Sequence, residues 1–392
     1  MNRKKFLAIF LAEIFLCVIS SLAIAYLWDH WFLNGPYGPY RWTGMDFVPF
    51  WTGARAMLSG ASPYSAAAAN TTQQLAYGGP AMNLDPLMFG YPAWIFLVIA
   101  PFAILPLKWA VATFAGLLLA ALLNLYFFFA RQWDKNNLRS LAIWAPILVI
   151  SGLPFVVISI TRGQLGYLGL FALFLSRRLW SRHPFWAGVA LSLALVKPTV
   201  TVLPTAGFLL WAFLERDWQY WLGFSLSMLI LTGSSILAIG NWIPDYLDVL
   251  RVSGGLEPLW SLKALAAPWN VLYAAVFTAI AGLALARSRQ TKDPQPWLSA
   301  SILSGIALFP MHWIYDLYLG MIIPSEAREL TGLRSIAVGA ALLFPWVLIF
   351  TPAPARWDMA VVGIPLAWAA AFLALFFCPT KQSPIAVGSA KS

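Results

Sequence analysis

The feature that most constrains this chain is a succession of apolar segments, each separated from the next by a short polar stretch. The first segment covers residues 6–28 and follows Arg3, Lys4 and Lys5. About 20 apolar residues suffice for one α-helix to cross the hydrocarbon core of a bilayer. A helix also satisfies its own backbone polar groups, as any segment in lipid must. We therefore predict an all-α integral membrane protein.

The composition agrees with a membrane protein and excludes several other classes. Only 10% of the 392 residues are charged, whereas about a quarter of the residues in soluble domains are charged. The formal charge of +10 is expected from basic cytoplasmic loops, so we predict no nucleic-acid partner. Cys17 and Cys378 both fall in apolar segments, which argues against disulfides and a cysteine metal site. The 3 histidines are scattered, and we expect no metal and no cofactor.

The remaining apolar stretches predict about twelve spans in all. Besides the first, we place them at residues 108–130, 141–160, 166–176, 184–196, 199–214, 219–240, 270–286, 296–310, 313–324, 336–350 and 359–378. Several are shorter than a lone span requires, so we expect tilted helices and half-helices. One membrane-embedded domain, residues 1–380, accounts for the whole pattern. The tail at 381–392 is predicted to be disordered and cytoplasmic.

The topology depends on residues 91–107, an apolar segment interrupted by Pro92, Pro101 and Pro106. If this segment crossed the membrane, the basic clusters at 131–139 and 177–182 would lie outside, against the positive-inside rule. If it enters and returns, both clusters lie inside. Broken backbone at membrane depth is tolerated where it lines a cavity. We therefore predict a re-entrant segment, cytoplasmic termini and two outside loops, at 29–86 and 241–269.

The first outside loop contains an acid at the start of a predicted amphipathic helix. Aromatic and apolar residues repeat there at helical spacing: Phe47, Phe50, Trp51, Ala54 and Met57. Asp46 precedes them, where an aspartate caps free backbone N–H groups, and Gly60 ends the helix. We expect its aromatic face to lie against lipid in the membrane interface, and a second short helix at 65–77. Asp46 is either a helix cap alone or a functional acid at the membrane surface.

Three short polar stretches join apolar segments on the predicted outside face. They contain Arg162 with Gln164, Lys197, and His312 with Asp316. A charge flanked by apolar helix is costly and marks a functional site by default. We expect Lys197 to bind a lipid phosphate, unless its ammonium extends to the headgroups. His312 would orient and polarise Asp46, unless it bonds a backbone carbonyl only. Asp316, four residues on, is a second acid or the partner of His312.

The other candidate residues have equally simple alternatives. Arg162 either shares the phosphate with Lys197 or faces lipid headgroups. Arg251 and Lys263, on the second outside loop, either reach the phosphate or belong to a solvated face. The first loop offers further substrate contacts, which are Trp51, Arg55 and Tyr64.

The pattern D-F-x-x-F-W-x-x-A-R-A-x-L-x-G-x-x-P-Y begins at Asp46 and is followed by the Gly163-Gln164 and Lys197-Pro198 pairs. In this order it resembles the bacterial membrane glycosyltransferases of family 87, once catalogued as a family of unknown function. These are similar to the mycobacterial polyprenol-phosphate-mannose-dependent α-mannosyltransferases. The resemblance covers residues 1–215 best and depends on His312 and hydropathy beyond them. It implies a GT-C fold, a catalytic base at Asp46 and a polyprenyl-phosphate sugar donor, mannose being the best-known sugar.

We therefore predict an inverting glycosyltransferase at the outer face of the bacterial cytoplasmic membrane. The sequence contains no Gly-rich nucleotide fingerprint, which argues against a sugar-nucleotide donor. Asp46 would take the proton of a lipid or glycan acceptor as it attacks the anomeric carbon, and one base with direct displacement gives inversion. The leaving phosphate would be held by basic and amide side chains, namely Lys197, Arg162, Gln164, Arg251 and Lys263.

Two other functions are compatible with the same pattern. A transporter or flippase of a lipid-linked sugar would also carry polar residues at broken helices, but it should show an internal repeat. A scaffold or assembly subunit would need no catalytic acid. The acid on an interfacial helix, together with a membrane-facing lysine, favours the enzyme.

Overall fold

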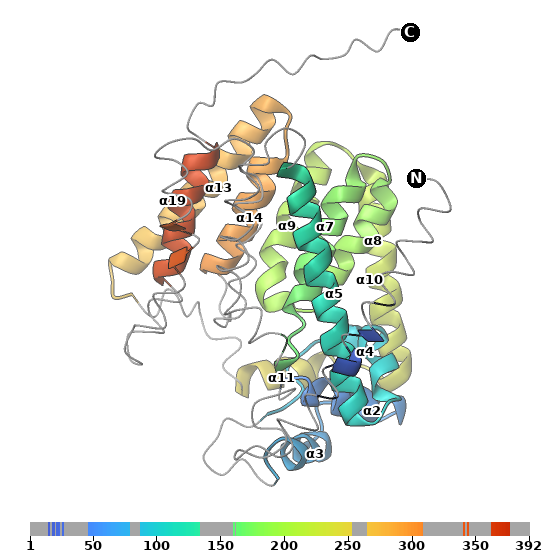
Figure 1. Ribbon diagram of the computed structural model, residues 1–392. Helices are drawn as coiled ribbons and strands as arrows, with labels where there is room; N and C mark the ends of the chain where they lie inside the picture. Colours follow the sequence, from blue (N-terminus) through green and yellow to red (C-terminus); the bar gives the residue numbers. More distant parts are fainter. Residues whose placement is uncertain are drawn as a thin grey trace, which may run out of the picture.

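The computed structural model describes residues 46–78, 87–133, 160, 162–252, 265–308 and 362–376, with single positions within 15–26 and 340–344. All regular elements in these residues are helical, which confirms the all-α prediction. Long helices run side by side in two groups (Figure 1). One group contains α5 (Leu107–Trp133), α7 (Gly166–Trp180), α8 (Pro184–Ala194), α9 (Pro198–Leu214) and α10 (Trp218–Ile239). The other contains α13 (Trp269–Thr291), α14 (Gln295–Leu308) and α19 (Ile364–Phe376).

Shorter helices gather at one end of the first group (Figure 1). They are α2 (Val48–Leu58), α3 (Ala66–Tyr77), the 3₁₀ turn η2 (Ala93–Ile95), α4 (Phe96–Ala103) and α11 (Ile243–Val252). The predicted helix at 65–77 is therefore confirmed as α3. Ser65 is its N-cap, and its side chain accepts a hydrogen bond from Ala68 N–H.

Membrane character follows from length, composition and exposed apolar surface. Helices α10 and α13 are each long and apolar enough to cross a bilayer, and the α4–α5 pair makes a third if it forms one span. On α10 large apolar side chains point outward, among them Leu222, Leu229 and Leu237. In water this surface would be unfavourable, whereas lipid chains accept it.

Several predicted spans coincide with helices of the structure. The predictions at 184–196, 199–214, 219–240, 270–286 and 296–310 correspond to α8, α9, α10, α13 and α14. The predictions at 313–324 and at 141–160 except residue 160, nearly all of the first span and the tail at 381–392 lie outside the described residues. The count of about twelve spans and the GT-C topology therefore stay predictions.

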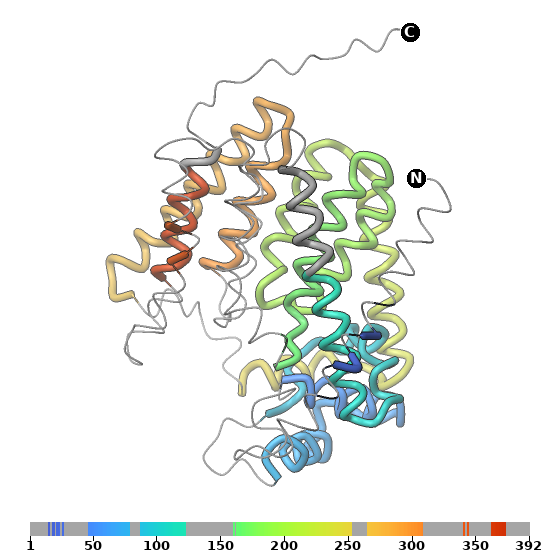
Figure 2. The backbone as a smooth tube through the Cα atoms, in the orientation of Figure 1, coloured from blue at the N-terminus to red at the C-terminus, as the bar shows by residue number. Residues whose placement is uncertain are grey.

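The segment predicted to be re-entrant forms η2 and α4, and α4 then turns sharply into α5. The two arms, Ala93–Ala103 and Leu107–Leu122, are bent by 113° (Figure 2). Pro106 precedes α5 and lacks the N–H that a continuous helix would need there. Such a bend is expected of a segment that enters and returns, and equally of a broken span. The re-entrant topology therefore stays a prediction.

The structure corrects one prediction about α2. We expected the aromatic face of this helix to lie on lipid, but it packs on protein. Phe47 stacks on Phe114 with ring centroids 4.6 Å apart, and Phe50 meets Tyr91 at 4.3 Å. The helix is therefore enclosed by α5 and by the segment before α4. The amphipathic pattern predicted the buried face correctly, but it cannot distinguish lipid from an apolar protein surface.

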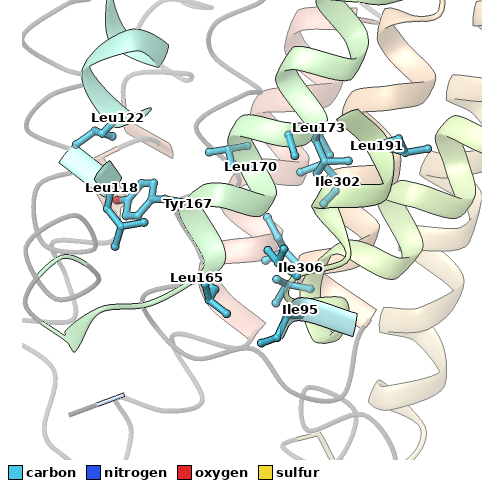
Figure 3. Packing of buried hydrophobic residues seen from close by; sticks show 14 of the residues in the cluster. Ile95, Leu118, Leu122, Leu165, Tyr167, Leu170, Leu173, Leu191, Ile302 and Ile306 are labelled. Carbon is cyan, nitrogen blue, oxygen red and sulfur yellow. The ribbon is translucent and has the colours of Figure 1, made fainter. Parts of the chain in front are cut away.

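The hydrophobic core is one cluster to which most of the described helices contribute, among them α7, α8 and α14. Leu173 of α7, Leu191 of α8 and Ile302 of α14 are fully buried or nearly so. Figure 3 shows these residues together with Leu165 and Ile95, which belong to the same cluster. Leu165, which ends the short loop before α7, is buried in this core. This loop carries Gln164.

Candidate active site at three helix ends

Asp46 lies two residues before α2 and is joined to a distant loop through its backbone. Its N–H donates to the carbonyl oxygen of Arg162 at 3.1 Å. Helix α2 begins at Val48 with Phe47 in the N-cap position. Asp46 is therefore not the N-cap residue that we predicted.

Gly163 allows the two segments to approach. Its φ is +75°, in the left-handed region that favours glycine. A Cβ at this position would lie 2.7 Å from the Cβ of Phe47, closer than carbon atoms can pack. A side chain at residue 163 would therefore separate Asp46 from the loop that contains Arg162 and Gln164.

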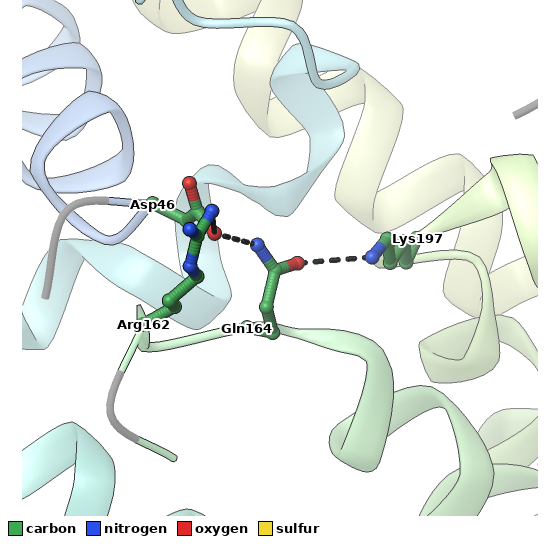
Figure 4. A network of polar contacts seen from close by, with 4 residues as sticks. All are labelled: Asp46, Arg162, Gln164 and Lys197. Atoms are coloured by element: carbon green, nitrogen blue, oxygen red, sulfur yellow. Dashed lines mark hydrogen bonds and ion pairs between the residues drawn. The ribbon is translucent and has the colours of Figure 1, made fainter. Parts of the chain in front are cut away.

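Gln164 connects Asp46 to Lys197. Its Nε2 donates to Asp46 Oδ2, and its Oε1 accepts from Lys197 Nζ at 2.9 Å (Figure 4). Because an ammonium can only donate and a carboxylate can only accept, this arrangement fixes which way the amide points. Gln164 is only 2% exposed, so the bridge lies inside the protein.

Lys197 stands at the break between α8 and α9. It occupies the N-cap position of α9 and is 3% exposed. Its ammonium donates to Gln164, so it points into the bundle rather than toward headgroups. The carbonyl groups that this break leaves without helical partners are bonded by side chains: Thr201 Oγ1 donates to Ala194 O at 2.7 Å, and Trp94 Nε1 donates to Leu195 O at 3.1 Å. Side-chain hydrogen bonds therefore stabilise the helix break beside Lys197.

Arg162 approaches the same carboxylate oxygen as Gln164. Its Nη1 lies 3.9 Å from Asp46 Oδ2, and the two side chains are 36% and 16% exposed. One oxygen of Asp46 therefore contacts both a partly exposed guanidinium and a buried amide. Arg162 and Lys197 carry two positive charges, Asp46 carries one negative charge and Gln164 is neutral. The four residues together therefore have a net positive charge. Such a site favours an anionic ligand.

Three first-loop candidates take part in packing. The indole of buried Trp51 donates to Leu105 O at 3.0 Å, and the Arg55 guanidinium lies 4.5 Å above its ring. The Tyr64 hydroxyl donates to Tyr91 O at 2.7 Å. Burial raises the pKa of the Tyr64 phenol well above its usual value, and burial raises the pKa of Tyr246 to about 12. Both rings lie in contact, so they join the first loop to α11.

Arg251 does not join the four-residue cluster in this structure. It lies on α11 and pairs with Asp248 of the same helix at 2.8 Å, and the two side chains are 68% and 69% exposed. This is the solvated face that we gave as its alternative. Lys263, His312 and Asp316 lie outside the described residues. Within the part of the chain that the structure describes, no three His, Cys, Asp or Glu side chains gather as metal ligands.

Sequence reasoning named all four residues of the cluster but missed how they meet. It took Gln164 as a phosphate ligand, whereas both ends of its amide contact protein groups. It also missed Trp94, whose indole supports the break beside Lys197. Nothing in the local pattern distinguishes Trp94 from the other tryptophans of apolar segments.

Comparison with known families adds an independent finding. Residues 89–315, more than half of the chain, match the family model described as glycosyltransferase family 87. The matched range includes Arg162, Gln164 and Lys197, and it ends just beyond His312. Asp46 precedes it, so the case for Asp46 depends on the geometry above. No curated protein and no solved structure matches the chain.

Proposed function

The chain belongs to glycosyltransferase family 87. From that premise we propose that it moves a hexose from a polyprenyl phosphate to a lipid or glycan acceptor, with mannose as the first candidate for the hexose. The site would open to the outer face of the bacterial cytoplasmic membrane, on a GT-C fold. Family membership favours a transferase over a transporter or flippase. The similarity to the mycobacterial mannosyltransferases belongs to the same proposal.

The observation that carries this proposal is the Gln164 bridge. A buried ammonium at a helix break and a partly exposed carboxylate are held one amide apart. Direct displacement at a sugar carbon requires a base on one face and a stabilised leaving group on the other. The cluster supplies one group of each kind, and its net positive charge suits a phosphate.

In the proposed reaction Asp46 accepts the proton of the acceptor hydroxyl. The oxygen of that hydroxyl forms the new bond to the anomeric carbon as the bond from this carbon to the phosphate oxygen breaks. The electron pair leaves with the polyprenyl phosphate, and the configuration inverts. Arg162 and Lys197 stabilise the negative charge that develops on the phosphate. Cations suffice for a monophosphate, so the proposal needs no metal.

Gln164 takes a different role in this proposal from the one that we predicted. Because both ends of its amide contact protein groups, we propose that Gln164 positions Asp46 and Lys197 and does not bind the phosphate directly. Trp51 is left out of the substrate contacts because it is buried and hydrogen-bonded. Lys263, His312 and Asp316 keep their proposed roles as phosphate ligand, partner of Asp46 and substrate contact.

The proposal is tested by donor choice. Purified full-length protein would be incubated with membrane lipids as acceptor and with labelled hexose on either a short polyprenyl phosphate or a nucleotide. We expect label in the product from the polyprenyl phosphate only, and an inverted anomeric centre by NMR. Transfer from the sugar nucleotide, or retention of configuration, would contradict it. An Asp248→Asn variant serves as the active control, because Asp248 is exposed on α11.

A further inference from the structure

An apolar groove runs along the outside of the bundle, between α7 and α8. Its walls are apolar and it encloses about 480 Å³. Its lining comes from Leu175 and Leu179 of α7 and from Trp186, Val189 and Leu193 of α8, with His183 at one end. Helix α7 begins next to Gln164, whereas its residues that line the groove, Leu175 and Leu179, lie near its other end. None of the four clustered residues lines the groove, so it is distinct from the proposed active site, although its Leu193 end lies four residues before Lys197.

The end of the groove at His183 is basic. Arg178 and Arg182 are exposed at the turn between α7 and α8. The neighbouring turn, between α9 and α10, lies beside it, because Trp180 Nε1 donates to Asp217 Oδ2 at 2.8 Å. The two turns and the helix ends beside them contain four arginines and two acidic residues, which gives a net charge of +2. The arginines are Arg177, Arg178, Arg182 and Arg216, and the acidic residues are Glu215 and Asp217.

The N-terminus of α8 adds to this positive end. His183 is its N-cap and makes no side-chain cap hydrogen bond, and Pro184 follows. Backbone N–H groups of the first turn therefore keep their partial positive charge. A helix start of this kind binds phosphate oxygens readily. The N-terminus of α8 therefore adds to the positive charge of the arginines. By itself, without the arginines and the groove, it would not define a binding site.

From these observations we propose that the groove binds an anionic glycerophospholipid. One acyl chain would lie along α8, and the phosphate would lie at its N-terminus with Arg178 and Arg182. The groove follows α8 from His183 to Leu193, about 15 Å at the helical rise per residue, which suits much of an acyl chain. Apolar walls match the chain, and the net charge of the two turns matches the headgroup. The proposal does not depend on the sugar-transfer reaction.

The test uses full-length protein in mild detergent and native mass spectrometry. Phosphatidylglycerol and phosphatidylethanolamine with identical chains would be compared. We expect the anionic lipid to bind more tightly. Arg182→Gln should weaken its binding about tenfold, the effect of one lost charge-assisted contact, while the zwitterionic lipid changes little. Val189→Trp fills the groove and should weaken both lipids. The matched controls are Arg289→Gln on α13 and Leu229→Trp on α10, both exposed.

Three results would overturn the proposal. The first is equal binding of both lipids by the wild type. The second is unchanged binding in Arg182→Gln and Val189→Trp, with thermal unfolding at the wild-type temperature to show that both variants are folded. The third is displacement of the anionic lipid by inorganic phosphate alone with no effect of Val189→Trp, because that would indicate a headgroup site without a chain.

Discussion

The cluster around Asp46 and the ion pair on α11 contain the same chemical groups in opposite settings. Arg251 and Asp248 are closer, at 2.8 Å, than Arg162 and Asp46, at 3.9 Å. Yet the α11 pair is exposed and lies within one helix, where such pairs contribute about 0–1 kcal/mol. Lys197, beside the longer pair, is almost fully buried. A buried charge is costly unless it is paired or used, so burial at a helix break identifies the site better than distance does.

The structure therefore distinguishes basic residues that had the same predicted setting in the sequence. Lys197, Arg162, Arg251 and Lys263 are all basic residues on predicted outside segments. The structure brings two of them to Asp46 and places Arg251 on an exposed helix surface. Substitutions in the two regions should therefore have very different effects.

The largest of these effects is expected for Lys197→Met, which keeps the stem but removes the charge. Loss of one preorganised group that faces developing charge costs about 2–4 kcal/mol in transition-state stabilisation. The measurement is kcat/KM for the polyprenyl-phosphate sugar. Lys197→Arg should recover part of the loss. The control is Lys108→Met, at the start of apolar helix α5. Normal donor turnover by Lys197→Met, with only the acceptor KM raised, would contradict the phosphate role.

Gln164→Glu should act mainly on the pH dependence. The new carboxylate would keep the contact to Lys197 but place a second negative charge beside Asp46. Two carboxylates that share a site do not both ionise readily. The acid limb of the pH–rate profile should therefore move to higher pH by about one unit or more. Gln74→Glu on α3, whose amide bonds its own helix end, should leave the profile unchanged. An unshifted profile in Gln164→Glu would refute the positioning role.

Tyr64→Phe tests the contact between the first loop and α11 and should have a smaller effect. Removing the hydroxyl loses its bond to Tyr91 O, worth about 0.5–1.5 kcal/mol of unfolding free energy. Burial raises the pKa of this phenol, so its protonated form stabilises the fold fully below pH 10, and that contribution is lost as the pH rises further. Unfolding in detergent at pH 8 and pH 10.5 measures both effects. An identical alkaline loss of stability in the variant would refute the second.

Arg251→Gln should have the smallest effect, because its pair with Asp248 is exposed. We expect a change of unfolding free energy below about 0.5 kcal/mol and unaltered sugar transfer. Steady-state kinetics and thermal unfolding of the same preparation check this. A tenfold loss of kcat/KM would mean that α11 reaches the donor phosphate, and it would remove the contrast between the two regions.

Helices were the most predictable part of this fold. Apolar length and flanking polar residues located α8, α9 and α10 because these properties are local. The environment of α2 was not predictable in the same way. Its aromatic spacing requires an apolar partner, and only the tertiary structure reveals that the partner is Phe114 and Tyr91 rather than lipid.

The candidate site was predictable as a set of residues but not as a geometry. Charges flanked by apolar helix pointed to Lys197 and Arg162 because such charges are rare and costly. The bridge through Gln164 depends on the left-handed turn at Gly163 and on a contact between residues 118 positions apart. No periodic pattern contains that information, so the sequence could not reveal that the amide joins base and cation.

The most direct test of the account is sugar transfer by Asp46→Asn beside its matched control, Asp248→Asn. Asparagine keeps the volume of Asp46 and one oxygen that can accept from Gln164, but it cannot take the acceptor proton. Single-turnover transfer from a labelled polyprenyl-phosphate sugar should fall about 10²–10⁴-fold, the range for loss of a general base, while donor binding persists. Asp248→Asn should transfer at the wild-type rate. Transfer by Asp46→Asn within a few-fold of wild type would contradict the claim that Asp46 is the base.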